Sequence, residues 1–91
     1  MKLVKEIIEK AEFIWSDELG IRCCLFADRP TSETERAIAL ACGLSFAGIR
    51  KLESEGIITA CTVDDECLHI TIREDVFKSE ADRFDLDRID A

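Results

Sequence analysis

A change of hydrophobic period at Gly56 constrains the fold more than any other feature of this sequence. Before this glycine, apolar residues recur every three or four positions, as they do on one face of an α-helix. After it, residues 57–63 are rich in β-branched side chains, and residues 68–72 alternate between apolar and polar. A short acidic run separates these two segments. The pattern predicts helices followed by a β-hairpin that turns at Asp64 and Asp65.

Length and charge indicate a small acidic globular domain. The 91 residues suffice for one hydrophobic core, and 47% of them are hydrophobic, which excludes a disordered acidic tail. The formal net charge of −8 argues against indiscriminate binding to nucleic acids or to anionic membranes. No apolar run approaches the roughly 18 residues of a membrane span, and the first ten residues lack the apolar stretch of a secretory signal. We therefore expect a cytoplasmic protein that does not enter a membrane.

The N-terminal third contains one clear helix and one ambiguous segment. Apolar side chains at helical spacing predict an amphipathic helix over residues 2–15. Residues 17–27 fit a helix, with apolar side chains at Leu19, Cys23 and Phe26, but they also fit a short buried strand. The helix is slightly favoured, and both alternatives stay open.

The middle of the chain predicts two helices joined by a three-residue turn. The first helix opens at a capping box formed by Ser32 and Glu35 and stops at Gly43. The second begins after its N-cap, Ser45, and ends at Gly56. Two helices and a hairpin in this order are the parts of a winged helix-turn-helix domain.

These elements predict an α+β fold that is mainly helical. Residues 1–73 would form a winged helix-turn-helix, with the C-terminal β-hairpin as its wing. Residues 74–91 carry seven acids and three bases and would form an acidic C-terminal extension, helical or dependent on a partner. Apolar side chains of the N-terminal helix, or Phe77 and Phe84 in the extension, would supply the contact of a homodimer.

A motif of matching residues runs through the second helix of the pair and into the hairpin. Its members are Gly43, Leu44, Ser45, Ile49, Arg50, Glu53, Gly56, Ile57 and Ile58. Residues 43–58 thereby resemble the second helix of regulators of the mercury-resistance (MerR) family. The resemblance implies a DNA-binding domain in which the matching arginine, Arg50, contacts a backbone phosphate.

The exposed face of this second helix supplies the candidate DNA-binding residues. Arg50 and Lys51 are placed to hold phosphates, and Arg36 in the preceding helix is a third cation. Ser45 caps the helix, and Ala47 occupies a position that reads base edges in such helices, although it has no hydrogen-bonding side chain. We predict a small DNA-binding regulator or accessory factor that acts as a homodimer.

A second function stays open because residues 31–58 carry three bases against four acids, a poor electrostatic platform for DNA. The apolar start of the second helix, at Phe46, Ala47 and Gly48, equally suits docking onto a protein groove. This alternative is an acidic protein-interaction module for a basic partner. Residues 74–91 would then make the contact or imitate the charge of a nucleic acid.

Five cysteines, an odd number without a secretory signal, predict reduced thiols rather than a disulfide framework. Cys61, Cys67 and His69 lie on one hairpin and are candidate metal ligands, with a fourth ligand to come from the remaining cysteines. Cys-x-x-Cys spacing is missing, and burial of cysteine as a small hydrophobic residue explains the same positions, so no cofactor is assigned. A thiol or metal sensor is the third interpretation.

The sequence does not predict an enzyme. His69 is the only histidine, and no serine or cysteine nucleophile is placed beside it in the manner of a catalytic pair. The chain has no glycine-rich phosphate loop, and its carboxylates are scattered over predicted helix faces and turns, where they serve solvation.

Overall fold

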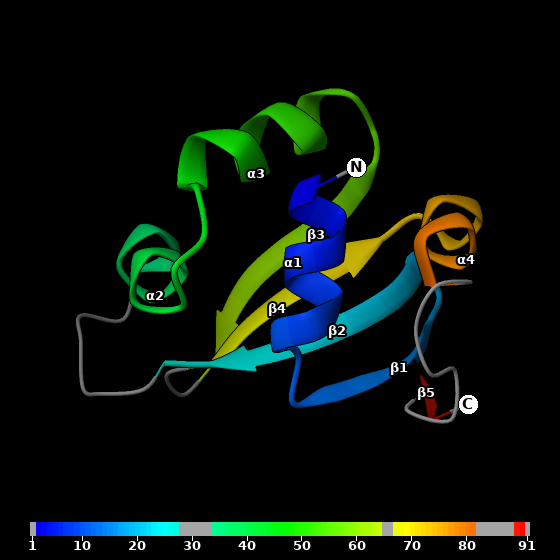
Figure 1. The fold of residues 1–91 in the computed structure, drawn as a ribbon, viewed down its shortest axis with the longest axis horizontal. Coiled ribbons are helices and arrows are strands. Elements are labelled where there is room, and N and C mark those ends of the chain that lie inside the picture. The colour runs from blue at the N-terminus through cyan, green and yellow to red at the C-terminus, as the bar shows by residue number, and fades with distance from the viewer. Residues whose placement is uncertain (1, 28–33, 65–66, 82–88, 91) are drawn as a thin grey trace.

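The computed structural model describes residues 2–27, 34–64, 67–81 and 89–90. They form an α+β fold in which the helices cover one face of a single sheet (Figure 1). The helices are α1 (Lys2–Lys10), α2 (Glu35–Ala41), α3 (Phe46–Ser54) and α4 (Glu74–Ala81). The strands are β1 (Phe13–Asp17), β2 (Gly20–Phe26), β3 (Ile58–Asp64), β4 (Cys67–Ile72) and β5 (Ile89–Asp90). None of the described helices is long and apolar enough to cross a membrane.

The strands form one sheet with the order β3–β4–β2–β1–β5. This sheet contradicts the prediction of a mainly helical winged helix-turn-helix. The predicted hairpin is present as β3 and β4. A wing would project from the domain, but here β4 also pairs antiparallel with β2, from Ile21–Ile72 to Phe26–Cys67. Because β1 and β2 form a second hairpin, strands and helices contribute about equally to the fold.

The N-terminal helix is shorter than predicted. It ends at Lys10, and Ile14 and Trp15, at the end of the predicted helix, lie in β1 instead. The segment 17–27 contains strand β2, so the slightly favoured helix is wrong. Aromatic and β-branched side chains fit a pleated surface, and Ile14 faces Cys23 across the hairpin on the buried side. In so short a segment the strand partner, rather than the spacing, decides the structure.

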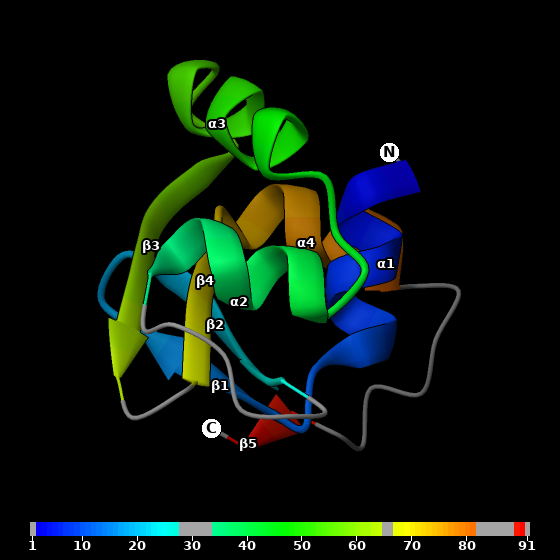
Figure 2. The ribbon, with the colours of Figure 1, turned by 90° about the vertical axis from the view of Figure 1, so that its left-hand side faces the viewer.

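The core lies between the sheet and the helices (Figure 2). Facing pairs of β2 and β4, Cys23–Ile70 and Leu25–Leu68, point into it. Helices contribute side chains that are at most 1% exposed: Val4, Ile7, Ile38, Ile49 and Phe77. Strand side chains alternate between the two faces of a sheet, so the other half of the strand residues lies on a second face that no described helix covers. We call this the uncovered face; it carries Phe13, Trp15, Arg22, Cys24, Phe26, Thr62, Cys67, His69 and Thr71.

Both helices of the predicted pair are present, as α2 and α3. The predicted cap of α3 is confirmed, because the Ser45 hydroxyl accepts a hydrogen bond of 3.1 Å from the amide of Gly48. The N-cap of α2 is Thr34. Three residues of the sequence predictions lie outside the described residues: Ser32 of the capping box, Asp65 of the turn and Phe84 of the extension.

The acidic C-terminal segment contributes to the same core in its described part. Helix α4 packs against α1 and β2, and its Phe77 and Ala81 are each 1% exposed. Strand β5 runs parallel to β1 through the pairs Ile14–Ile89 and Trp15–Asp90. Part of the predicted extension therefore completes the domain.

The position of β2 can be tested with two leucines of the same hairpin. Leu25 is fully buried in β2, whereas Leu19, in the turn between β1 and β2, is 58% exposed. Leu25→Ala is expected to lower the free energy of unfolding by about 2–5 kcal/mol, because it leaves a cavity under the helices. Leu19→Ala is expected to change it by less than about 0.5 kcal/mol. Denaturant unfolding gives both values, and equal effects of the two substitutions would contradict a core-facing β2.

Candidate functional site

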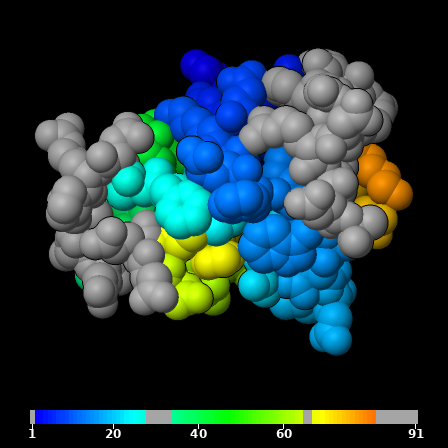
Figure 3. Space-filling model, turned by 90° about the horizontal axis from the view of Figure 1, so that it is seen from below, coloured from blue at the N-terminus to red at the C-terminus, as the bar shows by residue number. Residues whose placement is uncertain are grey.

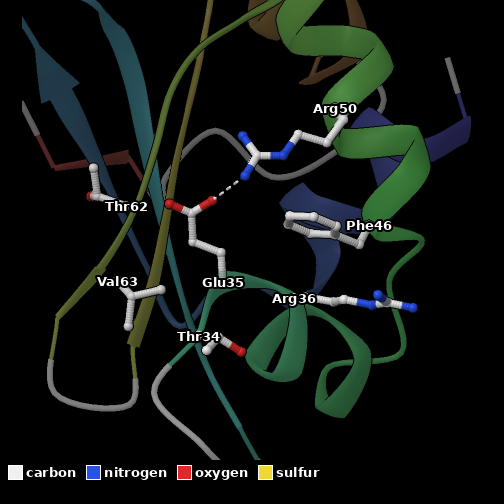
Figure 4. Close-up of a pocket in the computed structure, with 7 residues that line it drawn as sticks. All are labelled: Thr34, Glu35, Arg36, Phe46, Arg50, Thr62 and Val63. Atoms are coloured by element: carbon white, nitrogen blue, oxygen red, sulfur yellow. Dashed lines mark hydrogen bonds and ion pairs between the residues drawn. The ribbon is translucent and has the colours of Figure 1, made fainter.

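A cleft of about 510 Å³ lies beside β3 (Figure 4). Its walls come from the N-terminal end of α2, the first two turns of α3 and the end of β3. The lining residues are Thr34, Glu35, Arg36, Phe46, Arg50, Thr62 and Val63, and we call this hollow the β3 cleft. Helices and an edge strand therefore enclose one surface depression that combines apolar and charged groups.

Arg50 is the centre of the polar contacts in the β3 cleft. Its guanidinium donates hydrogen bonds of 3.2 Å to the carboxylate of Glu35 in α2 and of 3.2 Å to that of Glu53 in α3. The same group lies 4.7 Å from the ring centre of Phe46, at the distance of a cation–π contact. The Arg50 side chain is still 56% exposed. Two carboxylates thus balance the charge of the arginine that the sequence assigned to DNA phosphate.

Cys61 is half-buried on the covered side of β3, near the cleft. The pKa of its thiol depends on the charges around it. Burial raises the pKa of the Cys61 thiol to about 12, with further increases from the charges of Glu35 and Glu53 and a smaller opposing effect of Arg50. The two carboxylates therefore act on this thiol more strongly than the single arginine. At Cys61 the carboxylates therefore outweigh Arg50, whereas the lining of the cleft itself carries two arginines, Arg36 and Arg50, and one glutamate, Glu35.

The structure places the remaining predicted DNA-binding residues around α3. Arg36 is exposed and lines the β3 cleft, together with Arg50. Ser45 and Ala47 line a second hollow of about 460 Å³ on the other side of Phe46, which also includes Arg36 and the exposed Leu40. Lys51 is exposed on α3 and lines neither hollow.

The uncovered face of the sheet carries the second group of chemically distinctive residues. Figure 3 shows the molecule from this side, with β1 and β2 in blue to cyan and β4 in yellow. Phe13 and Phe26 form an edge-to-face pair with ring centres 6.1 Å apart, and they are 55% and 44% exposed. Trp15 packs edge-to-face on His69 at 6.1 Å, and the Arg22 guanidinium lies 5.7 Å from the Trp15 ring centre. Two aromatic pairs therefore stand on a face that a sheet of this size would otherwise expose as polar.

Between these aromatic pairs lies a cluster of Cys24, Cys67 and His69. The two sulfur atoms are 2.7 Å apart, and one potential ligand atom from each of the three residues lies within 4.8 Å of the others. Both cysteines are buried, and Nδ1 of His69 is buried with no hydrogen-bond partner among the described residues. Burial lowers the pKa of His69, and the charge of Arg22 lowers it further, against a smaller opposite effect of Asp64. Burial and the charge of Arg22 both favour the neutral imidazole, the form that has a lone pair to donate.

Two of the three metal-ligand candidates from the sequence, Cys67 and His69, belong to this cluster. The third, Cys61, faces Ile70 on the covered side of the hairpin, and Cys24 of β2 takes its place. Sequence reasoning included Cys24 only as one of three possible fourth ligands. The pairing of Cys24 with His69 depends on the structure of residues 17–27, and the sequence left that structure open.

The negative field near the β3 cleft can be tested through the reactivity of Cys61. At about pH 9, a thiol with a pKa of about 12 is roughly 0.1% thiolate, so Cys61 should react slowly with iodoacetamide. Glu35→Gln removes one negative charge and loosens the hold on Arg50, so the pKa should fall and alkylation should accelerate. Mass spectrometry of the labelled peptides measures this rate.

The matched control is Glu74→Gln, which changes a glutamate in the first turn of α4 that is also paired with a cation, Lys78. This control should leave the rate at Cys61 unchanged. Because burial is the largest cause of the raised pKa, the field itself is tested by the substitution: an unchanged alkylation rate in Glu35→Gln would contradict it.

Comparisons with protein-family models, with curated protein sequences and with solved structures gave no match to this chain.

Proposed function

We propose that this protein is an interaction domain that binds an extended, basic segment of a partner protein along β3 and in the β3 cleft. The observation that carries this proposal is the position of β3 at the edge of the sheet. Within the described residues β3 pairs only with β4, so its other edge presents backbone donors and acceptors beside the cleft. An extended peptide can add to such an edge as a further strand.

The composition of β3 supports peptide binding. Natural edge strands usually carry lysine, proline or inward-facing charges that prevent pairing with other chains. Between Ile58 and Val63 this strand has no charged residue and no proline, and only Asp64 at its end is charged. From Ala60 to Val63 the edge therefore has no charged residue or proline, and the irregularity in its pairing with β4 is confined to Ile58–Ala60. Such an edge is open to pairing with a strand of another chain.

The β3 cleft gives the added strand a place for side chains. Successive side chains of a strand point to opposite faces, so every second side chain of a peptide on β3 would point toward α2 and α3. There it meets Val63 and the half-buried ring of Phe46, which already contacts one cation. An apolar or long basic side chain fits this environment, because aliphatic stems pack on aromatic rings.

Charge indicates the chemistry of the partner. The chain has a net charge of −8, and the carboxylates of Glu35 and Glu53 dominate the field at Cys61 even with Arg50 between them. A basic side chain of the partner can form an ion pair with one of these carboxylates while Arg50 remains paired with the other. Complementary charge of this kind gives specificity and fast association.

DNA binding, the first interpretation of the sequence, stays a prediction that the same experiment can test. For Arg50 to contact phosphate it would have to leave Glu35 and Glu53, and the phosphate would compete with these two carboxylates for the guanidinium. Lys51 and Arg36 are exposed and are the remaining cations of the predicted contact. The geometry around Arg50 favours a cationic partner over an anionic one.

The binding experiment uses a phage-displayed library of random peptides, selected against the whole chain. We expect enrichment of peptides that alternate lysine or arginine with β-branched residues. In NMR titrations with a selected peptide, amide shifts should change along β3 and at the start of α3. Glu35→Lys should weaken binding at least tenfold, or by about 1.4 kcal/mol, because it reverses a charge in the cleft. The matched control Glu74→Lys, on α4, should bind as the wild type does.

Two results would contradict the proposal. One is the enrichment of acidic peptides, or shift changes confined to strands other than β3. The other is tight binding of a random-sequence DNA duplex at low salt that is lost on Arg50→Glu and Lys51→Glu substitution, which would restore the DNA-binding interpretation.

A further inference from the structure

We propose that Cys24, Cys67 and His69 form a binding site for a thiophilic metal ion of the zinc(II) or copper(I) class on the uncovered face of the sheet. This site is separate from the β3 cleft, and the inference does not depend on the peptide-binding proposal. It rests on the arrangement of the three side chains, on the atoms that they offer and on their surroundings.

The backbone fixes the three residues relative to one another. Cys24 of β2 faces His69 of β4 directly, and Cys67 lies two residues from His69 on the same strand and the same face. The three ligand atoms span at most 4.8 Å. Around a tetrahedral zinc ion with bonds of about 2.3 Å, two sulfur atoms stand about 3.8 Å apart. The present sulfur–sulfur distance of 2.7 Å must therefore open by roughly 1 Å, which side-chain rotation supplies without a change in the backbone.

Two sulfurs and one imidazole nitrogen select the class of metal. Thiolate ligands prefer zinc(II) and copper(I), whereas magnesium and calcium require oxygen ligands. On binding, each cysteine that becomes a thiolate releases its proton to solvent, and the neutral His69 donates a lone pair without losing a proton. No oxidation or reduction takes part in this step. Three protein ligands satisfy copper(I) with trigonal geometry or leave zinc(II) one further position.

Burial of cysteine as a hydrophobic residue does not explain this cluster. Cys23 is the example of that role: it is fully buried on the covered side, among the residues of the core. Its neighbour Cys24 points to the opposite face, where Cys67 joins it from another strand. A histidine beside them keeps a buried nitrogen without a hydrogen bond among the described residues, which is costly unless something binds there. A metal ion bound through that nitrogen would satisfy it.

The aromatic side chains complete the site. The ring of Trp15 lies against His69 and restricts the orientation of the imidazole, and Phe13 and Phe26 flank the two cysteines along β1 and β2. Such a shell limits access of water to the thiolates and strengthens their bonds to the metal. The remaining coordination position would face outward, because no described helix covers this face.

The test titrates the whole protein, kept reduced with a phosphine, with cobalt(II), zinc(II) and copper(I). We expect one cobalt ion per chain, with the strong visible absorption of tetrahedral cobalt and a near-ultraviolet band from thiolate. Zinc should displace cobalt and raise the melting temperature. Competition with a zinc-binding dye and with a copper(I) chelator shows which of the two ions binds more tightly.

Substitutions assign the ligands. Cys24→Ser, Cys67→Ser and His69→Ala should each weaken binding at least tenfold, whereas Cys61→Ser and Cys42→Ser should bind as the wild type does. Circular dichroism checks that each variant is folded. The substitution His69→Ala lies on the uncovered face and leaves the core intact. If either cysteine variant fails to fold, the metal affinity of His69→Ala therefore tests the proposed site.

Failure of wild type to bind any of these ions in stoichiometric amount would overturn the proposal. So would binding that His69→Ala leaves unchanged, or binding that depends on Cys61 or Cys42. These outcomes do not bear on the β3 cleft, because peptide binding is measured on different residues.

Discussion

The pairing of β2 with β4 holds the structure together. It joins two hairpins that are far apart in the chain, and six residue pairs from Ile21–Ile72 to Phe26–Cys67 establish it. On one side it sets Leu25 against Leu68 beneath the helices, where full burial of each such side chain contributes about 1.5–3 kcal/mol. On the other side it sets Cys24 against His69. Without this pairing there would be neither a continuous core nor the cluster of Cys24, Cys67 and His69.

The alternation of side chains along β3 from Ala60 onward, and along β4, relates the two proposed sites. Val63 of β3 lines the β3 cleft on the covered side, while Thr62, which borders the same cleft at the edge of the sheet, pairs with His69 on the other face. A shift of the register by one residue would exchange the two faces and destroy both sites. The buried pairs, such as Cys61–Ile70, resist that shift, because it would expose apolar side chains. Packing of the core therefore fixes the positions of the functional groups on both faces.

Local signals predicted the parts of the fold that depend on local interactions. The change of period at Gly56, the cap at Ser45 and the helical face of residues 46–54 all have counterparts in the structure. Residues 13–27 were misjudged because a strand of five to seven residues owes its stability to its partners, which the sequence does not display. The fold class was wrong for the same reason, since a hairpin that pairs with a second hairpin is no longer a wing.

The candidate sites were harder to predict than the helices. Cys24 and Cys67 are separated by 43 positions in the chain, so only the pairing of β2 with β4 shows that they meet. Arg50 was recognised as an exposed cation, but its contact with Glu35 crosses from α3 to α2 and gave no signal in the spacing of residues. Glu35 itself was assigned to a helix cap and instead holds Arg50. Where a side chain has several possible partners, the tertiary structure determines which partner it contacts.

Backbone nuclear Overhauser effects across β2 and β4 test the central claim most directly. The structure predicts cross-strand contacts in the register Cys23–Ile70 and Cys24–His69, together with strand-type chemical shifts from Gly20 to Phe26. Slow amide exchange on both edges of β4 should accompany them, because β4 is an inner strand. Contacts of β4 with β3 alone, and helical contacts within residues 20–26, would show a free wing and contradict the account.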